Sequence, residues 1–452
     1  MKRALPLTLA LLIILFSGCT NMPKDNISSA DYYDYIYENG TEYIDSIASA
    51  IESDINDKVI VGEATVSEIY SSYVTDSLDD GYLYPNESGK QNAVIDSTIT
   101  SDNAKIIDEA DINTTGSKPL YYTYLNPSQQ RIYRIMKTAA EQMTTGLFSL
   151  DAVSSKEDRI TDIAIAFRAL SSDNPQIFWL PDSYITSPDG SKLAFSYKNL
   201  DYTFTAEEKL KAEQKVNDVV GRLTSQAQKL NSRFEKELFF HNWLCENVSY
   251  NNDGTDDIYT VYGALINGVA VCEGYARAMQ LLCNSVGIPC TVTYGFLNGV
   301  GHMWNIIDPG DGWYHLDVTC DDDEEFGYVR YAYFNFSDEL ILLDHTLFDA
   351  VVSGKSYIAA DCFNIYLYNC NSAAYNYFIK KNLIFNDDIN AATQLILNAV
   401  SKGQTSIELL YMCSNKDYKY VLSQVNQALY NSGSSVFVKS YSPLGNSIVL
   451  RW

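Results

Sequence analysis

The strongest constraint on the fold is a turn-rich stretch, Asp308-Pro-Gly-Asp-Gly312, which separates two apolar segments at residues 302–307 and 313–319. Pro and Gly at this spacing favour a tight reversal of the chain, so the sequence predicts an antiparallel β-hairpin. A helical pattern at residues 270–286 precedes the hairpin, and Gly287 supplies its stop signal. A helix followed by short antiparallel strands is typical of an α+β fold.

The length of the hairpin loop decides which side chains share a face. A two-residue loop at Gly310-Asp311, or a four-residue loop at residues 309–312, pairs His302 with Thr319. Asp317 then lies diagonally across from His302 on the same face, within reach of an imidazole–carboxylate hydrogen bond. A three-residue loop would move Asp317 to the opposite face, because side chains alternate along a strand.

A cysteine stands at the start of the helix before the hairpin. In Gly268-Val-Ala-Val-Cys-Glu-Gly-Tyr-Ala-Arg277, Cys272 falls in the first helical turn. A helix N-terminus carries partial positive charge and free N–H groups, which favour a thiolate and can bind an oxyanion. Cys283 lies on nearly the same helix face but about 16 Å along the axis, so it cannot assist this thiol. Taken alone, a cysteine here is more often a small buried residue.

Three segments in chain order resemble the transglutaminase-like superfamily: VCEGYA around Cys272, GHMWN around His302 and WYHLDVT around Asp317. The upstream segments HNWLCENVSY and VYGALINGVAV are similar to the lead-in helix and loop of bacterial lipoprotein members. The resemblance covers about residues 234–321. It implies a papain-like α+β core, with the helix-start cysteine packed on an antiparallel sheet and the three residues acting as a catalytic triad.

The resemblance also implies thiol acyl-transfer chemistry. His302 would take the Cys272 proton, the thiolate would attack an amide carbonyl, and Asp317 would hold the imidazole while a thioester forms. The Cys272 N–H is one expected oxyanion donor, and Tyr262 is a candidate for the second, although it is equally a core residue. Trp304, on the His302 face, is a candidate lining of the acyl tunnel, with a packed core position as the alternative.

The acceptor of the acyl group stays open at this stage. Water would make the chain a cysteine protease or amidase, which we favour because water needs no second substrate site. An amine would make it a cross-linking transglutaminase. The non-enzymatic alternative is a surface adhesion or scaffold protein, for which the 35 tyrosines would suit carbohydrate or peptide binding. The expected partner is a protein or peptide substrate, with cell-wall peptide as one option.

Other candidate residues carry weaker signals. His315 falls opposite Ile306, roughly 13 Å along the strand from His302, and is the weaker candidate for the base. We expect His241 and His345 to be structural, since neither has a recognisable partner motif. The acidic run at residues 321–325 does not have the spacing of a cation loop and reads as a solvated turn. Neither CxxC nor zinc spacing occurs, so we expect no metal and no cofactor, and the cysteines do not support a disulfide framework.

The first residues read MKRALPLTLALLIILFSGCT, with Lys2 and Arg3 before an apolar run. This pattern predicts a signal peptide at residues 1–18. The small residues before Cys19 resemble a bacterial lipoprotein signal, which implies lipid attachment at Cys19, although the usual aliphatic residue three places earlier is Phe16. A conventionally cleaved or uncleaved segment is the alternative. We therefore expect an extracytoplasmic protein anchored to the bacterial cell membrane through its lipid.

Acidic residues dominate the stretch after the signal. Residues 24–118 hold about 20 acidic and about five basic residues, out of a net charge of −25 for the chain. We interpret this stretch mainly as a solvated spacer, with local structure at residues 32–55 and 59–73. The overall negative charge argues against binding nucleic acid.

The hydrophobic patterns of the remaining chain predict further helices and strands. We expect helices at 127–143, 162–170 and 207–230 and strands at 176–184 and 193–204 before the triad region, then helices at 389–401 and 418–432 and strands at 406–412, 435–441 and 447–452 after it. The predicted parts are the signal at 1–18, a partly disordered spacer at 19–118, a helical α+β module at 119–230, a transglutaminase-like domain at 231–340 and a small C-terminal α/β region at 341–452.

Overall fold

The computed structural model describes residues 93–95, 104, 105, 107, 120–150, 159–181, 183–195, 205–253, 256–297, 300–323, 328–347 and 369–452. All of them belong to one of the chain's two compact units, Ser77–Trp452. The signal segment with Cys19 and the two structured pieces expected in the spacer lie outside the described residues. Within the described part, no helix has the length and apolar character that a membrane span requires.

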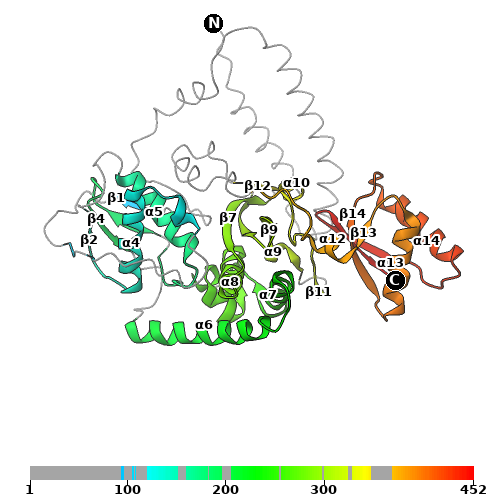
Figure 1. The fold of residues 1–452 in the computed structure, drawn as a ribbon, viewed down its shortest axis with the longest axis horizontal. Helices are drawn as coiled ribbons and strands as arrows, with labels where there is room; N and C mark the ends of the chain where they lie inside the picture. The colour runs from blue at the N-terminus through cyan, green and yellow to red at the C-terminus, as the bar shows by residue number, and fades with distance from the viewer. Residues whose placement is uncertain are drawn as a thin grey trace, which may run out of the picture. The chain divides into compact units, whose positions relative to one another are not determined.

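A four-stranded antiparallel sheet in the order β12-β7-β8-β9 forms the centre of residues 231–347, which we call the central region. Its strands are β7 (Cys290–Leu297), β8 (Val300–Ile307), β9 (Tyr314–Leu316) and β12 (His345–Leu347). Helix α8 (Cys272–Ser285) packs on β7 and β8, and α7 (Arg233–Asn247) packs on α8 (Figure 1). The predicted α+β fold, with a helix-start cysteine on an antiparallel sheet, is confirmed.

The hairpin of β8 and β9 has the register expected for an even loop. Ile306 pairs with His315, and the same register continued would set His302 opposite Thr319. The hairpin is locked to the helix by Asn305, whose side-chain amide donates hydrogen bonds to the carbonyls of Ala276 at 2.8 Å and Thr291 at 3.2 Å. This register places the His302 face of β8 toward the end of β9.

The second strand of the hairpin is shorter than predicted. It ends at Leu316, and the chain turns into the short helix α9 (Val318–Asp321). Asp317 is the N-cap of α9, because its carboxylate accepts a hydrogen bond from the backbone N–H of Cys320. The expected strand at 313–319 is therefore wrong beyond Leu316, where an aspartate cap competes with strand pairing.

Short elements connect the main helices and strands of the central region. Between α7 and α8, strand β5 pairs in parallel with β6. These elements are β5 (Ser249–Tyr250), η5 (Asp256–Tyr259), η6 (Gly263–Asn267), β6 (Val269–Ala270), β10 (Asp322–Asp323), β11 (Tyr328–Val329) and α10 (Asp338–Ile341).

The preceding module has its own sheet in the order β1-β3-β4-β2. Its elements are β1 (Ala93–Ile95), η3 (Tyr121–Tyr124), α4 (Pro127–Glu141), β2 (Phe148–Ser149), α5 (Arg159–Asp173), β3 (Tyr184–Thr186) and β4 (Lys192–Phe195). The expected helices at 127–143 and 162–170 are confirmed. The expected strand at 176–184 is wrong except for Tyr184, because the backbone at 174–180 forms local turn hydrogen bonds instead of pairing.

Two contacts cross the borders expected from the sequence. Strand β1 pairs in parallel with β3, so the module's sheet takes a strand from the stretch read as spacer, residues 19–118. Helix α6 (Ala206–Ala227) buries Val216 and Leu223 in the same apolar cluster as Phe234. By its buried face, α6 packs with the central region that follows it.

The C-terminal region forms a third sheet, in the order β13-β14-β16-β15, with a core of its own. Its elements are α12 (Tyr377–Lys381), β13 (Ile384–Phe385), α13 (Ile389–Ser401), β14 (Ser406–Tyr411), α14 (Tyr418–Asn431), β15 (Ser440–Leu444) and β16 (Ser447–Arg451). The expected strand at 435–441 begins only at Ser440, because the side chain of Asn426 bonds both backbone groups of Val438.

Candidate active site

Cys272 is the first residue of α8, as the sequence predicts. The residue before it, Val271, is the N-cap and makes no side-chain hydrogen bond to the helix, so no cap covers the first N–H groups. A Cβ atom at Gly274 would lie 2.4 Å from the carbonyl oxygen of Ile258, so only glycine lets the helix start pack this closely. The Cys272 side chain is partly exposed, which leaves its thiol accessible.

His302 on β8 and Asp317 at the start of α9 form a buried ion pair. His302 Nε2 lies 2.6 Å from Asp317 Oδ2. Burial opposes the charged imidazole, but the Asp317 carboxylate beside it holds the pKa of His302 well above its usual range. Burial also opposes the carboxylate, but His302 and His345 hold the pKa of Asp317 well below its usual range. Both groups are therefore charged at neutral pH.

The third member of the predicted triad reaches the same imidazole. The Cys272 thiol lies close enough to His302 to contribute to the raised pKa of that imidazole. Because Asp317 occupies Nε2, Nδ1 is the ring nitrogen left for this thiol. The structure thus brings together a thiol from α8, an imidazole from β8 and a carboxylate from the start of α9.

A second histidine bonds the same carboxylate oxygen. His345 on β12 has its Nε2 3.0 Å from Asp317 Oδ2 and its Nδ1 2.6 Å from Asp344 Oδ1. Burial opposes its charge, but hydrogen bonds to these two carboxylates raise the pKa of His345 to about 11. The sequence offered no partner motif for His345, but in the fold it has two carboxylate partners. Strand β12 brings His345 to the site by pairing with β7, and no local sequence pattern predicts this pairing.

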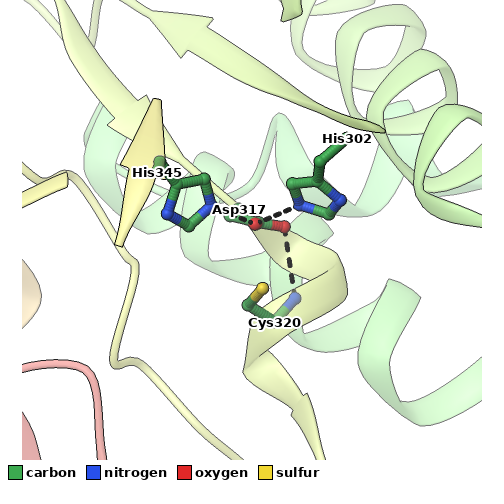
Figure 2. A group of neighbouring side chains, drawn as sticks. All are labelled: His302, Asp317, Cys320 and His345. Carbon is green, nitrogen blue, oxygen red and sulfur yellow. Dashed lines mark hydrogen bonds and ion pairs between the residues drawn. The ribbon is translucent and has the colours of Figure 1, made fainter. Parts of the chain in front are cut away.

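A second thiol completes the group around the carboxylate. The backbone N–H of Cys320 donates to Asp317 Oδ1 at 3.1 Å, and its sulfur lies within 4.8 Å of a ring nitrogen of each histidine. Burial raises the pKa of the Cys320 thiol. Figure 2 shows His302, Cys320 and His345 placed around the Asp317 carboxylate. We call these four residues the Asp317 cluster: His302, Asp317, Cys320 and His345.

Trp304 and His315 form a separate hydrogen-bonded chain beside this cluster. The Trp304 indole N–H donates to His315 Nδ1 at 3.0 Å, and His315 Nε2 lies 2.8 Å from Asp338 Oδ1. Burial lowers the pKa of His315 despite this carboxylate. Trp304 is 1% exposed and its ring stacks beside His302, at 5.9 Å between centroids. These contacts favour the packed core position for Trp304 over the tunnel lining.

Tyr262 has partners away from the triad. Its hydroxyl accepts a hydrogen bond from Lys215 Nζ at 3.3 Å, and its ring lies 5.5 Å from that of Phe178. These contacts favour the core alternative for Tyr262. A different tyrosine, Tyr250 on β5, lies close enough to Cys272 for the thiol's charge to raise the phenol's pKa, after burial as the main cause.

The first two residues of the acidic run, Asp321 and Asp322, do not form part of the solvated turn that we expect from the sequence. Asp321 is fully buried, and its carboxylate lies 3.1 Å from His241 Nε2 and accepts the backbone N–H of Tyr333. Asp322 hydrogen-bonds the hydroxyl of Tyr275 on α8. The first two acidic residues therefore tie α9 and its following strand to α7 and α8. His241 is structural, as predicted.

Two side-chain groups among the described residues have metal-ligand chemistry. One is the Asp317 cluster, and the other consists of His315, Asp338 and Cys370. In the second group the Trp304 N–H donates to His315 Nδ1, so His315 Nε2 carries the ring proton and donates to Asp338. That nitrogen has no lone pair for a metal. The seven cysteines of the described part are all free thiols.

The fold and the three converging side chains define a papain-like class of domain, with a cysteine at a helix start and a histidine–carboxylate pair on the adjacent sheet. The model of the transglutaminase-like superfamily matches residues 219–318, so this part of the chain is a transglutaminase-like domain. The resemblance seen in the sequence is thereby confirmed. This match suggests enzymatic activity of the cysteine protease or acyltransferase kind. No curated protein matches the chain.

Several solved structures are similar to part of the chain. A TGase has 15% identity and a TM-score of 0.23, over 28% of this chain and 40% of its own. A presumed cysteine protease from Cytophaga hutchinsonii has 21% identity and a TM-score of 0.21, over 23% and 37%. A presumed protease from Parabacteroides distasonis has 11% identity and a TM-score of 0.18, over 30% and 43%. Because these TM-scores are low, the assignment rests on the family model.

Proposed function

We propose that the chain is a surface-anchored thiol enzyme that cleaves protein or peptide amides through Cys272, His302 and Asp317. One observation carries the proposal: His302 lies 2.6 Å from Asp317 and close enough to the Cys272 thiol for that thiol to raise the imidazole's pKa. Thiol acyl transfer needs a nucleophile next to a base, and a carboxylate that orients the base.

The charge state of the site favours a reactive thiolate. The pKa of His302 is held well above its usual range by the Asp317 carboxylate, so the imidazole keeps a proton at neutral pH. A protonated imidazole next to the thiol stabilises the thiolate, which is the nucleophile. Asp317 also fixes which ring nitrogen faces the thiol, because its oxygen occupies Nε2.

Acylation follows from this starting state. The Cys272 sulfur bonds to the amide carbonyl carbon, and the carbonyl π electrons move onto oxygen. When the tetrahedral intermediate collapses, the C–N bond breaks and the His302 imidazolium gives its Nδ1 proton to the leaving amine. The products of this half-reaction are a thioester on Cys272, a neutral His302 and a free amine.

The developing oxyanion has two donors within the site. The backbone N–H of Cys272 stands at the uncapped start of α8. We assign the second donor to Tyr250, because β5 pairs Tyr250 with Ala270, two residues before Cys272. Its raised pKa keeps the phenolic proton in place at neutral pH. Tyr250→Phe should lower the rate of acylation by about 10- to 100-fold, and an unchanged rate would remove it from this role.

Water completes the reaction. The neutral His302 accepts a proton from water as its oxygen attacks the thioester, and the proton then returns to the Cys272 sulfur as the acid product leaves. The same thioester can pass to an amine, which would make the activity transamidation. We propose hydrolysis as the main outcome, because it needs no second substrate site.

Surface anchoring is part of the proposal. Lipid on Cys19 would hold the enzyme at the outer face of the membrane, next to extracytoplasmic proteins and cell-wall peptides. Cys19→Ala should move the chain from the membrane fraction to the soluble fraction. A chain that stays membrane-bound after this change would contradict lipid anchoring.

The activity is tested with a peptide library, incubated with and without a primary amine and analysed by mass. Hydrolysis yields fragments that together gain one water, whereas transamidation replaces ammonia by the amine. The matched controls are Cys272→Ala and Cys245→Ala, the latter a partly buried cysteine on α7. Hydrolysis lost only in Cys272→Ala supports the proposal. Amine products alone would favour the transglutaminase, and no products at all would favour the binding protein.

A further inference from the structure

The Asp317 cluster contains more ligand-type side chains than an acyl-transfer triad uses. Two imidazoles, one carboxylate and one thiol each direct an atom into the same small volume, and these atoms all lie within 4.8 Å of one another. Cys320 and His345 belong to this group but have no part in the acyl-transfer steps. Their convergence on a catalytic carboxylate needs a separate account.

The four side chains come from elements that hold them rigidly. His302 lies in the middle of β8, and His345 begins β12, on the other side of β7. Asp317 and Cys320 are three residues apart at the start of α9, so one helical turn sets the thiol beside the carboxylate. His302, Asp317 and His345 are each less than 10% exposed. Such preorganised donors lose little freedom when they bind a ligand.

The donor set matches one class of ligand. Two imidazole nitrogens, a thiolate and a carboxylate oxygen are the ligands of tetrahedral zinc sites, whereas calcium and magnesium require oxygen donors. Zinc bonds of about 2.0 to 2.3 Å place tetrahedral ligand atoms about 3.3 to 3.8 Å apart. Side-chain shifts on the order of 1 Å would therefore bring the four atoms around a single ion.

We propose that the Asp317 cluster is a zinc-binding site that reversibly switches off the thiol enzyme. Zinc binds to Nε2 of both histidines, to a carboxylate oxygen of Asp317 and to the Cys320 sulfur. Binding releases the thiol proton and the proton on each Nε2. The ion therefore takes the place of the hydrogen bonds that now join the imidazoles to the carboxylate.

Inhibition follows from which atoms the ion occupies. With zinc on Nε2, His302 loses its bond to Asp317 and is a neutral ligand whose one proton stays on Nδ1. Giving that proton to the leaving amine would leave a zinc-bound imidazolate, so the imidazole no longer serves as the acid of the acylation step. Metal binding itself does not depend on the proposed activity, whereas its inhibitory consequence rests on it.

Binding is tested with cobalt(II), which replaces zinc and gives a thiolate-to-metal charge-transfer absorption band. The full chain should show this band on titration, and the Cys272→Ser variant should keep it. Cys320→Ser should lose the band, and His345→Gln should weaken cobalt binding at least about 10-fold. A band that disappears in Cys272→Ser but persists in Cys320→Ser would overturn the assignment, as would no band in the full chain.

Inhibition is tested with zinc itself, using peptide cleavage normalised to the same variant in chelator. Zinc should suppress the activity of the full chain, and chelator should restore it. In Cys320→Ser the zinc concentration that halves activity should rise at least about 10-fold. Equal zinc sensitivity of both proteins contradicts the inference. A cobalt band in a chain that cleaves no peptide would instead contradict the proposed function and leave the metal site standing.

Discussion

Two histidine–carboxylate pairs lie close together in the central sheet, and only one of them has the arrangement of a catalytic base. His302 bonds Asp317 through Nε2 and keeps its other nitrogen for the Cys272 thiol. His315 bonds Asp338 through Nε2, but its Nδ1 already accepts the Trp304 indole N–H. A carboxylate partner is therefore not what distinguishes them. The distinguishing feature is whether the second ring nitrogen faces a nucleophile or a structural donor.

The exposure of the two carboxylates and the pKa values of the two histidines support the same distinction. The Asp317 carboxylate is 1% exposed, while the Asp338 side chain is 30% exposed and more strongly screened by water. Asp317 accordingly holds the pKa of His302 well above its usual range, whereas burial lowers the pKa of His315. The first imidazole is charged at neutral pH and the second is neutral. A charged imidazole next to a thiol supports catalysis, and a neutral one between a donor and an acceptor supports packing.

The largest expected effect separates the two histidines directly. His302→Ala should lower the rate of peptide cleavage by at least about 1,000-fold, because it removes the base and the partner of the thiolate. His315→Ala should lower stability by roughly 2 to 4 kcal/mol while the rate per folded molecule stays within about 10-fold. Cleavage assays on both variants, with the folded fraction measured by circular dichroism, check this. Similar losses of activity in the two would contradict the distinction.

Replacing the two carboxylates, Asp317 and Asp338, should also affect the cleavage rate unequally, with the larger loss at Asp317. Asp317→Asn should lower the cleavage rate by about 100- to 10,000-fold, because an amide can no longer stabilise the imidazolium or set its orientation. Asp338→Asn, the matched control, should change the rate by less than about 10-fold, since Asp338 reaches the triad only through His315 and Trp304. Steady-state kinetics of the two variants decide the point. A small effect of Asp317→Asn would place the role of orienting carboxylate elsewhere.

The contact of His345 with Asp317 predicts a pH-dependent effect. The pKa of His345 is raised from 6.5 to about 11, so its stabilising contribution is complete below pH 6.5 and declines as pH rises toward 11. The stability difference between the wild type and His345→Gln should therefore shrink between pH 7 and 9, by at most about 1.4 kcal/mol per pH unit. Urea unfolding at several pH values measures this difference. A pH-independent difference would show that His345 is not charged in the fold.

The smallest expected effect concerns the donor that occupies His315. Trp304→Phe removes the indole N–H and leaves His315 Nδ1 without its donor, at a cost of about 1 to 3 kcal/mol in unfolding free energy. Cleavage should change by less than about 10-fold, because the phenyl ring still packs beside His302. Denaturant unfolding and kinetics of this variant check both expectations. A loss of activity as large as that of His302→Ala would place Trp304 in the catalytic machinery.

Local patterns predicted those features that depend on neighbours in the sequence. The even loop of the hairpin sets the pairing of Ile306 with His315, and this register is observed. The stop signal at Gly287 similarly marks the end of α8. The meeting of His302 and Asp317 was predictable because both lie on or next to one hairpin, and the proposed nucleophile Cys272 starts the helix before it, within a stretch of 46 residues from Cys272 to Asp317.

Features that depend on distant contacts were not predictable in this way. His345 reaches Asp317 because β12 pairs with β7, and nothing around residue 345 announces that pairing. The buried roles of Asp321 and Asp322 were hidden by their position in an acidic run, which is usually solvated. Strand β9 ends at Leu316 because Asp317 caps helix α9 instead of continuing the strand. The sequence is compatible with either role for Asp317.

The central claim is that His302 makes Cys272 a reactive thiolate, and site-resolved alkylation tests it most directly. The full chain is treated with limiting iodoacetamide at neutral pH, and the modification of each cysteine is quantified by peptide mass. Cys272 should be modified at least about 10-fold faster than Cys245 or Cys320, and His302→Ala should abolish this preference while His315→Ala keeps it. Labelling of Cys272 that is no faster than the other thiols, or that is unchanged in His302→Ala, would contradict the account.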